Sequence, residues 1–236
     1  MTNAFSSRAE IYDKEFAKGF PVDWETQILY KYLTVKGVLL DVGCGTGRHV
    51  VPLAEKGFDV VGIDKDKEML MTSQTKLRLG KLNGSLILAD AKKLPLRGDI
   101  FDYVVAMGNV LGEVGVHSRD RETMVDEIKR TAKTNGILIV ELVHRYWNAK
   151  DLFIWAWRHI TTAWQKLGKK LVEFGDYTET IRTNHEEFKL TFHAFTANEA
   201  RKLLLSRGLQ ATIEKRGKIF HNWFFEVGSK TTESTT

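Results

Sequence analysis

A short apolar run leads into a cluster of glycines in the segment VLLDVGCGTGRHV, residues 38–50. The run over residues 38–42 is typical of a buried strand, and a helix is expected after the glycines. Gly43, Gly45 and Gly47 stand where a backbone that turns sharply against a ligand leaves no room for a Cβ atom. The free N–H groups at the start of the following helix favour a polar or anionic ligand group. The segment therefore predicts a small-molecule site at the end of a strand.

An acidic residue ends the next expected strand, residues 58–63. Asp64 follows Arg48 by sixteen residues, and in doubly wound folds a carboxylate at this place accepts hydrogen bonds from ribose hydroxyls. A dinucleotide loop, G-x-G-x-x-G, needs glycine where Arg48 or Val50 stands. A phosphate loop needs Gly-Lys-Ser/Thr, which does not follow. The spacing therefore excludes both of these nucleotide loops.

Five segments, in order, resemble the motifs of the class I S-adenosylmethionine-dependent methyltransferases. The glycine loop resembles the first motif, Asp/Glu-x-Gly-x-Gly-x-Gly, with Asp41 as its acidic residue. The segments VVGIDKDKEML, LILADAKKLPL and FDYVVAMGNVLGEV resemble the motifs of the second, third and fourth strands, and TNGILIVELVHR resembles the fifth strand. These segments lie within residues 38–145, nearly half of the chain. One glycine loop is weak evidence of a family, whereas five ordered segments are specific.

The resemblance implies that the chain binds S-adenosylmethionine as methyl donor and releases S-adenosylhomocysteine, with no metal. Asp41 and the loop glycines would hold the methionine end, and Asp64 the ribose. Asp90 and Ala91 would flank the adenine, and the residues after the fourth strand, Gly108 among them, would lie beneath the sulfonium. The resemblance thus predicts a set of donor-binding residues: Asp41, Gly43, Gly45, Gly47, Asp64, Lys65, Asp90, Ala91, Met107 and Asn109.

The motifs leave the catalytic residues open. A sulfonium is already an activated electrophile, so the protein must align donor and acceptor within roughly 3–3.5 Å and exclude water. Neither a catalytic triad nor a metal is required, and the seven histidines show no metal-ligand spacing. Three candidates stand at suitable places: His144 at the end of the fifth strand, Asn109 after the fourth, and Tyr12, which matches a tyrosine that often covers the donor in such enzymes. Simple packing is the alternative for Tyr12, and a structural or surface role is the alternative for His144.

Short apolar runs alternate with amphipathic stretches through the first 145 residues, which predicts βαβ crossovers. We expect an α/β, Rossmann-like, doubly wound fold with a mostly parallel seven-stranded sheet, an antiparallel edge and a cap made of a helix and a hairpin. Residues 177–195 show two extended runs, and Thr196 with Glu199 predicts a capped helix before a last strand. A single domain, residues 1–227, is expected to comprise an N-terminal helical lid (1–36), a donor-binding core (37–145), an acceptor cap (146–195) and a C-terminal helix and strand (196–227), before a disordered tail (228–236).

Tryptophans and basic residues gather in residues 144–175. Apolar residues at steps of three and four predict one stripe of a long helix, where core packing is favoured: Phe153, Trp157, Ile160, Trp164, Leu167 and Leu171. Further residues lie off the stripe and suit a pocket, a partner or a membrane surface: Trp147, Ile154 and Trp155. The basic residues form either a solvated face or, with the aromatic rings, an RNA-binding surface: His144, Arg145, Lys150, Arg158, Lys166, Lys169 and Lys170.

The acceptor is constrained mainly by exclusion. The formal net charge of +5 is mild and demands no anionic partner. Enzymes that methylate base amines typically carry Asp/Asn/Ser-Pro-Pro-Tyr/Phe after the fourth strand, where this chain has MGNVL at residues 107–111. The segments EIYDKEF and FKLTFHAF are loosely similar to the glycine/sarcosine N-methyltransferase group. The leading hypothesis is methyl transfer to a small-molecule acceptor. An RNA methyltransferase acting on tRNA and a non-catalytic donor-binding partner subunit are the alternatives.

The compartment is predicted from what the sequence lacks. Cys44 is the single cysteine, which fits a reducing environment. Residues 1–20 show no signal-peptide pattern, and no run reaches 18 apolar residues. We therefore expect a cytoplasmic protein without integral membrane association. The sequence predicts no oligomeric state.

Overall fold

The chain is described by a computed structural model. The described residues are 22–113, 117–145, 173, 175–182, 187–209, 211–216 and 222–227, with the single positions 9, 12, 13, 153, 154, 156, 157, 160 and 161. Several expectations lie outside them: half of the lid, just over half of the cap, the tail 228–236, and Trp147, Lys150, Trp155, Arg158, Trp164, Lys166, Leu167, Lys169, Lys170 and Leu171. Within the described part, no helix is both long enough and apolar enough to span a membrane.

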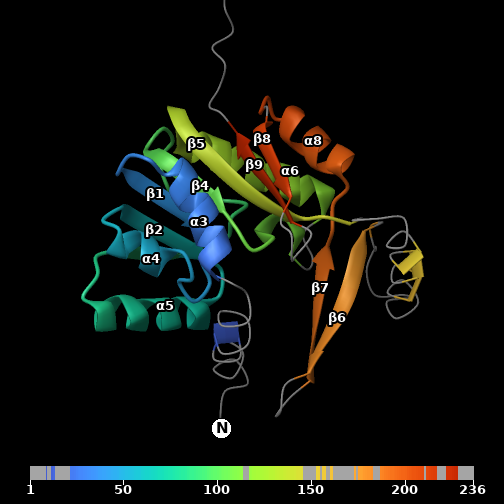
Figure 1. The fold of residues 1–236 in the computed structure, drawn as a ribbon, viewed down its shortest axis with the longest axis horizontal. Helices are drawn as coiled ribbons and strands as arrows, with labels where there is room; N and C mark the ends of the chain where they lie inside the picture. Colours follow the sequence, from blue (N-terminus) through green and yellow to red (C-terminus); the bar gives the residue numbers. More distant parts are fainter. Residues whose placement is uncertain are drawn as a thin grey trace, which may run out of the picture.

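A mostly parallel sheet forms the centre of the molecule (Figure 1). Its strands lie in the order β3-β2-β1-β4-β5-β9-β8, and the first five of these are parallel to one another. Strand β9 is antiparallel to both of its neighbours and provides the expected antiparallel edge. The Rossmann-like α/β fold with a mostly parallel sheet is therefore confirmed. The strands are β1 (Val38–Val42), β2 (Asp59–Asp64), β3 (Ser85–Leu88), β4 (Phe101–Ala106), β5 (Ala132–Val143), β8 (Ala211–Arg216) and β9 (Asn222–Val227).

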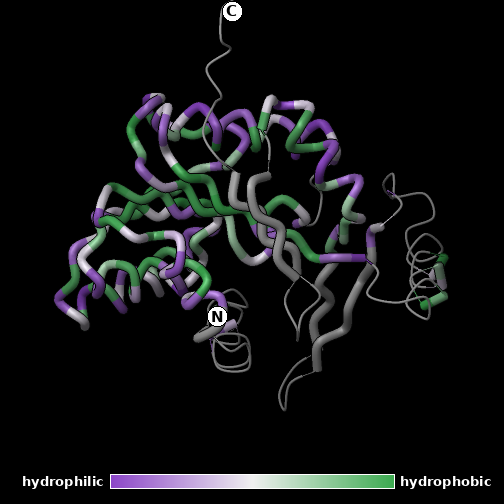
Figure 2. Tube along the Cα trace, turned by 45° about the horizontal axis from the view of Figure 1, so that its top comes forward, coloured by the Kyte–Doolittle hydropathy of each residue, from purple (hydrophilic) through white to green (hydrophobic). Residues whose placement is uncertain are grey.

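Helices cover both faces of this sheet because successive residues of each buried strand point to opposite sides. Leu39 packs in one core with residues of α3, α4 and α5. Leu40 and Val42 pack in another core with residues of α6 and α8. Figure 2 shows the consequence, with hydrophobic strands in the middle and mixed polarity along the helices. The helices are α3 (Val22–Tyr32), α4 (Val50–Glu55), α5 (Lys67–Gly80), α6 (Ser118–Thr131) and α8 (Ala197–Leu205), with a 3-10 turn, η2 (Val110–Gly112).

Two parts of the sheet differ from the sequence-based expectation. Strand β8 was not predicted, because its sequence ATIEKR is largely polar and carries no clear alternation. Strand β5 begins at Ala132, five residues before the apolar run of the fifth-strand segment begins at Ile137. A shift of register accounts for the longer strand, since Phe101 pairs with Ala132 while Tyr103 pairs with Ile137. A step of two residues along β4 thus corresponds to a step of five along β5, and a Cβ atom on Gly136 would lie 3.1 Å from the backbone of Lys133. The region of Asn135 and Gly136 therefore forms an irregularity within the strand.

A separate hairpin extends away from the main sheet (Figure 1). Its strands β6 (Asp176–Arg182) and β7 (Glu187–His193) are antiparallel, which confirms the two extended runs. Thr196 caps α8 in a capping box with Glu199, also as expected. The wider acceptor cap of residues 146–195 stays a prediction, because the described residues include little of it beyond this hairpin.

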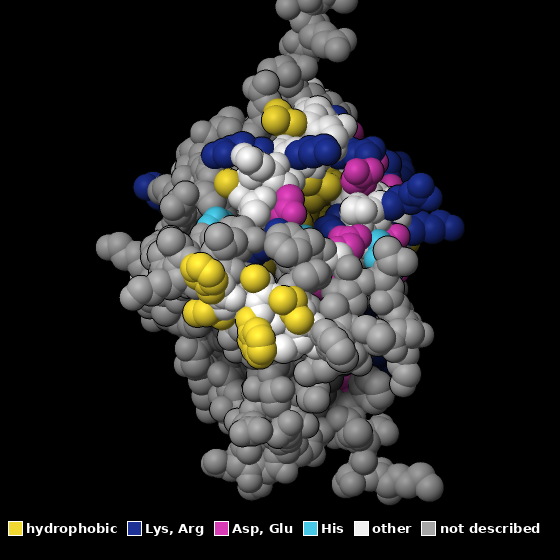
Figure 3. Space-filling view, turned by 90° about the vertical axis from the view of Figure 1, so that its right-hand side faces the viewer, with side chains coloured by type: hydrophobic (Ala, Val, Ile, Leu, Met, Phe, Trp, Pro, Cys, Tyr) yellow, Lys and Arg dark blue, Asp and Glu magenta, His cyan; other side chains and the backbone are white. Residues whose placement is uncertain are grey.

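The expected core packing of Trp157 is wrong. Its side chain is 68% exposed and that of Phe153 is 79% exposed, although both positions are helical. Ile154 and Ile160 are also exposed, and together these side chains form a hydrophobic patch on one face of the molecule (Figure 3). A periodic pattern identifies the apolar side of a helix, but it does not establish that another element covers that side.

Candidate active site

The predicted donor residues converge at the carboxyl edge of the parallel strands. Strand β1 lies between β2 and β4, so the chain leaves β1 at the point where the strand order reverses. Ligands of open α/β sheets bind outside the carboxyl ends of the strands at such a point. Here the backbone amides of Gly43 and Cys44 donate to the carbonyl of Ile63, at 2.7 and 2.9 Å. The glycine turn is thereby fixed to the end of β2.

Two glycines of this turn have different environments. Gly47 has a φ of +83°, and a Cβ atom there would collide with the hydroxyl of Ser73 on α5. Gly45 has a φ of +52°, and a Cβ atom there would meet no atom within 4 Å. Gly47 is therefore required by packing inside the protein. Gly45 instead presents bare backbone to open space, as a loop that receives a ligand must.

Asp64 connects the end of β2 to this open backbone. Its Oδ2 atom accepts a hydrogen bond of 2.8 Å from the amide of Gly45, and its Oδ1 atom accepts one of 2.8 Å from Asp66. Burial raises the pKa of Asp64, while these two amide hydrogen bonds oppose the change. Each carboxylate oxygen retains a second lone pair, so the residue can also accept ribose hydroxyls.

The remaining predicted donor residues lie at the same edge. Lys65 follows Asp64 and pairs at 2.8 Å with Glu113, which lies just beyond η2. Asp90 lies after β3, is exposed, and accepts a hydrogen bond from the amide of Lys92. Ala91 follows it and is half-buried, whereas Met107 after β4 is fully buried. These positions agree with the expected order of ribose, adenine and sulfonium, but their roles toward a donor stay predictions.

A buried ionic cluster behind the glycine turn was missed by the sequence analysis. Glu25 of α3 pairs with Arg48 at 2.9 Å and contacts Nε2 of His49 at 3.3 Å. The Nε atom of Arg48 and the Oδ2 atom of Asp41 are buried, and no described residue offers either a hydrogen bond. Unsatisfied buried polar atoms are rare in proteins, and these two fit the charged methionine end of a donor. The positions of Arg48 and His49, immediately after Gly47, were the available clue.

Burial dominates the protonation of this cluster. Burial raises the pKa of Asp41 to about 6. Burial also raises the pKa of Glu141 on β5 to about 7, and the negative charge of Glu25 acts on Glu141 in the same direction. By contrast, burial lowers the pKa of His49 to about 4, so His49 is neutral at pH 7. Glu141 also accepts a 2.7 Å hydrogen bond from the amide of Gly108, which follows β4. The turn beneath the expected sulfonium is thus fixed to β5 by a carboxyl group.

Asn109 is a buried connector. Its φ of +61° is left-handed, and its side chain amide donates to the carbonyl of His193 at 3.2 Å. Its Oδ1 atom accepts from the amide of Val143 at 3.3 Å. Both polar ends of this side chain therefore bind backbone, which joins the end of β4 to the ends of β5 and β7. Asn109 therefore holds the backbone at these three strand ends in position.

The two other catalytic candidates, Tyr12 and His144, lie in different surroundings at this edge of the sheet. Burial raises the pKa of Tyr12, and the charges of Arg48, Glu25 and Asp64 all act on it, so Tyr12 is close to the buried cluster. His144 follows β5, is half-buried, and forms an isolated bridge with Phe195. The structure brings Tyr12 to the glycine turn and places His144 beside the base of the hairpin. Their catalytic roles stay predictions.

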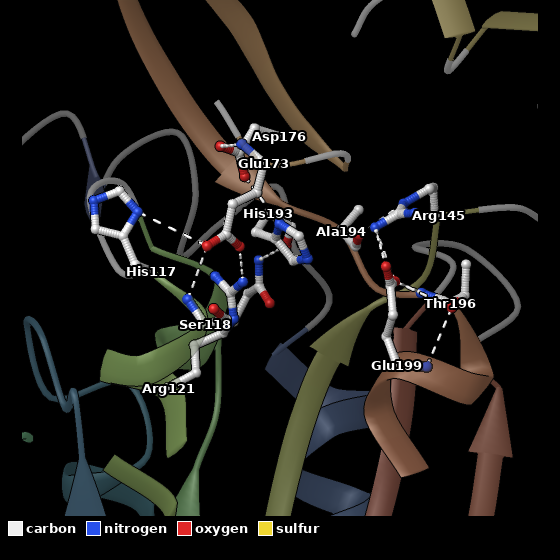
Figure 4. Close-up of polar contacts among 11 residues, drawn as sticks. His117, Ser118, Arg121, Arg145, Glu173, Asp176, His193, Ala194, Thr196 and Glu199 are labelled. Atoms are coloured by element: carbon white, nitrogen blue, oxygen red, sulfur yellow. Dashed lines mark hydrogen bonds and ion pairs between the residues drawn. The ribbon is translucent and has the colours of Figure 1, made fainter. Parts of the chain in front are cut away.

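Two buried arginines hold the base of the hairpin to the core (Figure 4). Arg121 of α6 pairs with Glu173, whose Oε1 atom accepts a hydrogen bond from the amide of Ser118. Arg145 donates to the carbonyl of Ala194 at 2.9 Å and pairs with Glu199 at 2.8 Å. The sequence analysis assigned Arg145 to a solvated or RNA-binding face. That assignment is wrong, because Arg145 is only 2% exposed and its guanidinium group binds Ala194 and Glu199 within the protein.

The chain matches known methyltransferases in sequence and in fold. Residues 39–136 match the model of a methyltransferase domain family. A putative methyltransferase of Bacillus subtilis is 32% identical over 61% of this chain and 57% of its own length. The glycine/sarcosine N-methyltransferase of Parasynechococcus marenigrum is 31% identical over 55% of this chain and 51% of its own length. The chain thus spans little more than half the length of these relatives.

Structural similarity extends over more of the chain. The crystal structure of a SAM-dependent methyltransferase from Methanosarcina mazei superposes with a TM-score of 0.70 at 24% identity. The alignment covers 86% of this chain and 96% of that one, so the similarity in fold extends beyond the residues that match the domain family. The chain thus has the fold of S-adenosylmethionine-dependent methyltransferases, and over residues 39–136 it is also similar in sequence to a methyltransferase domain.

Proposed function

We propose that the chain transfers a methyl group from S-adenosylmethionine to a small-molecule acceptor. One observation carries the donor side of this proposal: the open backbone of Gly45 lies beside the carboxylate of Asp64 at the switch point of the sheet. When bound, S-adenosylmethionine supplies a methyl group on a positively charged sulfur. The protein must then hold the donor and acceptor in line and exclude water.

The residues present fit this donor. Gly45 leaves room for a ligand, and Asp64 offers lone pairs to a ribose. Asp41 and Arg48 keep one buried polar atom each without a partner among the described residues, beside the place expected for the amino and carboxylate groups of methionine. A carboxylate and a guanidinium are the complementary partners for those two groups.

The acceptor side favours a small molecule over a polyanion. Arg121 and Arg145 are the buried arginines at the base of the hairpin, and both are paired with carboxylates. They are therefore not available to the phosphates of a nucleic acid backbone. RNA-binding surfaces bind such phosphates with cationic side chains that are not paired within the protein. The relative from Parasynechococcus marenigrum, by its name, acts on glycine and sarcosine, which supports a small acceptor for this chain as well.

The test is release of S-adenosylhomocysteine with defined acceptors. Purified chain and donor are incubated with saturating glycine, sarcosine or catechol, or with purified total tRNA, and the product is measured by mass spectrometry. Turnover with a small molecule supports the proposal. Turnover with tRNA alone overturns it, and reversing the charges of Lys166, Lys169 and Lys170 would then weaken RNA binding and reduce its salt dependence.

A further inference from the structure

A histidine with a carboxylate partner lies against the turn that follows β4. His193, the last residue of β7, is 5% exposed, and its Nδ1 atom is 2.9 Å from Oδ1 of Asp176 on β6. The two residues face each other as a pair in the hairpin register. A carboxylate at Nδ1 holds the proton on that nitrogen and leaves Nε2 as the proton acceptor of the neutral ring. The pair thus has the arrangement of an oriented general base.

Among the described residues, the Nε2 atom of His193 has no polar partner. No described residue hydrogen-bonds Nε2, and this atom is not among the enclosed polar side-chain atoms of the described part. Burial acts to raise the pKa of Asp176, but its hydrogen bond with His193 holds the pKa below its usual range. Asp176 is therefore a carboxylate that can stabilise a positive charge on the ring.

The backbone of His193 is fixed to the predicted sulfonium turn. Asn109 donates to its carbonyl, and a Cβ atom on Gly112 would lie 2.5 Å from the same oxygen. Phe192, the preceding residue, forms a bridge with Glu113. The end of β7 is thus packed directly on the segment that leaves β4, where the resemblance places the sulfonium.

We propose that His193, oriented by Asp176, is the base that receives the proton of the acceptor nucleophile. This proposal rests on the proposed function. The nucleophilic oxygen or nitrogen forms a bond to the methyl carbon, the carbon–sulfur bond breaks, and its electron pair remains on sulfur. The proton of the nucleophile passes to Nε2, so one positive charge leaves the sulfur and one appears on the imidazole. The step calls for an acceptor whose nucleophile carries a proton. A hydroxyl group loses that proton to Nε2 as the bond to carbon forms, whereas an ammonium group must first lose a proton to Nε2, because its nitrogen has no lone pair until then.

Other charged groups near His193 do not take over this role. Glu173, which precedes β6, accepts from Arg121 and from the amide of Ser118, so its oxygens are occupied. Arg121 lies over the ring of Phe195 at 5.6 Å, and the same ring meets His193 edge to face at 4.7 Å. Figure 4 shows Asp176, Glu173, Arg121 and His193 converging at the base of the hairpin. Among these groups, His193 alone keeps a nitrogen open.

The test compares two ligands that differ by one methyl group and one charge. Protein labelled with ¹³C at the histidine ε1 carbons is titrated with pH by NMR, and His193→Gln identifies the resonance of His193. S-adenosylmethionine carries the sulfonium charge and S-adenosylhomocysteine does not. Because like charges repel, the titration midpoint of His193 is expected about one pH unit lower with S-adenosylmethionine. His117, which approaches Glu173 from the other side, is the internal control and should change less.

The possible outcomes separate this proposal from the donor assignment. Equal midpoints of His193 in the two complexes overturn the proposal, whereas failure of either ligand to bind in calorimetry overturns the proposed function instead. Once an acceptor is identified, His193→Gln should reduce turnover about 100-fold or more, with the affinity for S-adenosylhomocysteine within about twofold of the wild type. His117→Gln should retain wild-type turnover. Full turnover in a folded His193→Gln protein overturns the proposal.

Discussion

The carboxylate of Asp64 accepts a hydrogen bond from the backbone amide of Gly45, 2.8 Å away, although nineteen residues separate them in the chain. This bond joins two motifs that the sequence presents separately, the glycine turn after β1 and the acidic end of β2. It also places an anionic acceptor beside the one loop glycine where a Cβ atom would meet only open space. The ligand-facing part of the turn is therefore held in shape before any ligand arrives.

Removal of this carboxylate should weaken donor binding. Asp64→Ala deletes an acceptor for two ribose hydroxyls, so the affinity for S-adenosylhomocysteine should fall by about 1–3 kcal/mol. Calorimetric titration measures the change. Asp59→Asn is the matched control, because Asp59 is exposed at the opposite end of the same strand. Wild-type affinity in Asp64→Ala would refute the assigned donor site.

The two loop glycines should respond differently to alanine. Gly45→Ala imposes a left-handed alanine, which costs about 1–2 kcal/mol of stability, and it should reduce donor affinity about tenfold or more because the methyl group enters the ligand space. Gly47→Ala adds a collision with Ser73 and should cost about 2–5 kcal/mol. Urea denaturation and calorimetry together measure both effects. If Gly45→Ala lost as much stability as Gly47→Ala and still bound the donor with wild-type affinity, the assignment of Gly45 to the ligand and of Gly47 to packing would be contradicted.

Stability should depend on pH through Glu141. Its pKa is raised from 4.5 to about 7 in the folded protein, so the folded state binds a proton that the unfolded chain has released. The stability contributed by this proton is present at low pH and is lost as the pH rises toward 7. Glu141→Gln removes this dependence. Relative to the wild type, its free energy of unfolding should therefore rise by about 1–3 kcal/mol between pH 5 and pH 8.

Urea denaturation at pH 5, 6.5 and 8 gives this comparison. His49, whose pKa burial lowers to about 4, has the opposite dependence below pH 6.5, and the charge of Glu141 also acts on that pKa. The change from pH 6.5 to pH 8, where His49 is neutral, therefore isolates Glu141. Glu55→Gln, at an exposed position of α4, should show no such trend. A difference between Glu141→Gln and wild type that is constant with pH would count against a buried, protonated Glu141.

The exposed aromatic residues of the hydrophobic patch should contribute little to stability. Trp157→Ser and Phe153→Ser should change the free energy of unfolding by less than about 0.5 kcal/mol, because both side chains are mostly exposed. Leu111→Ala, at a fully buried position of η2, should cost about 2–5 kcal/mol. Thermal denaturation of the three variants compares them directly. A loss of more than about 2 kcal/mol in Trp157→Ser would restore the core assignment.

The meeting of the glycine turn and Asp64 was predictable because it depends on local backbone chemistry. The glycine turn and the strand-end position of Asp64 require particular residue types at fixed spacing, which a single sequence displays. Strand β8 and the early start of β5 were not predictable, since they depend on pairing with strands distant in the chain. The N-terminal cap of α8 was also predictable, because Thr196 and Glu199 form a capping box from residues close in the chain.

The buried charges were missed for a related reason. Glu25 lies on a helix before the core motifs, and nothing in its neighbourhood predicts that it pairs with Arg48. The partnership of His193 with Asp176 likewise depends on hairpin register and on a contact with Asn109 more than eighty residues away. Periodicity in the sequence located these elements. It did not establish which charged side chains would be buried together or, for Trp157, which apolar side chains would stay exposed.

The most direct measurement of the central claim is transfer of a radiolabelled methyl group from S-adenosylmethionine into a cell extract. After the reaction, the extract is separated into small molecules, RNA and protein before counting, and Asp64→Ala provides the control for donor dependence. The account predicts label in the small-molecule fraction, in amounts that fall sharply in the Asp64→Ala reaction. Label confined to nuclease-sensitive material or to protein would contradict it.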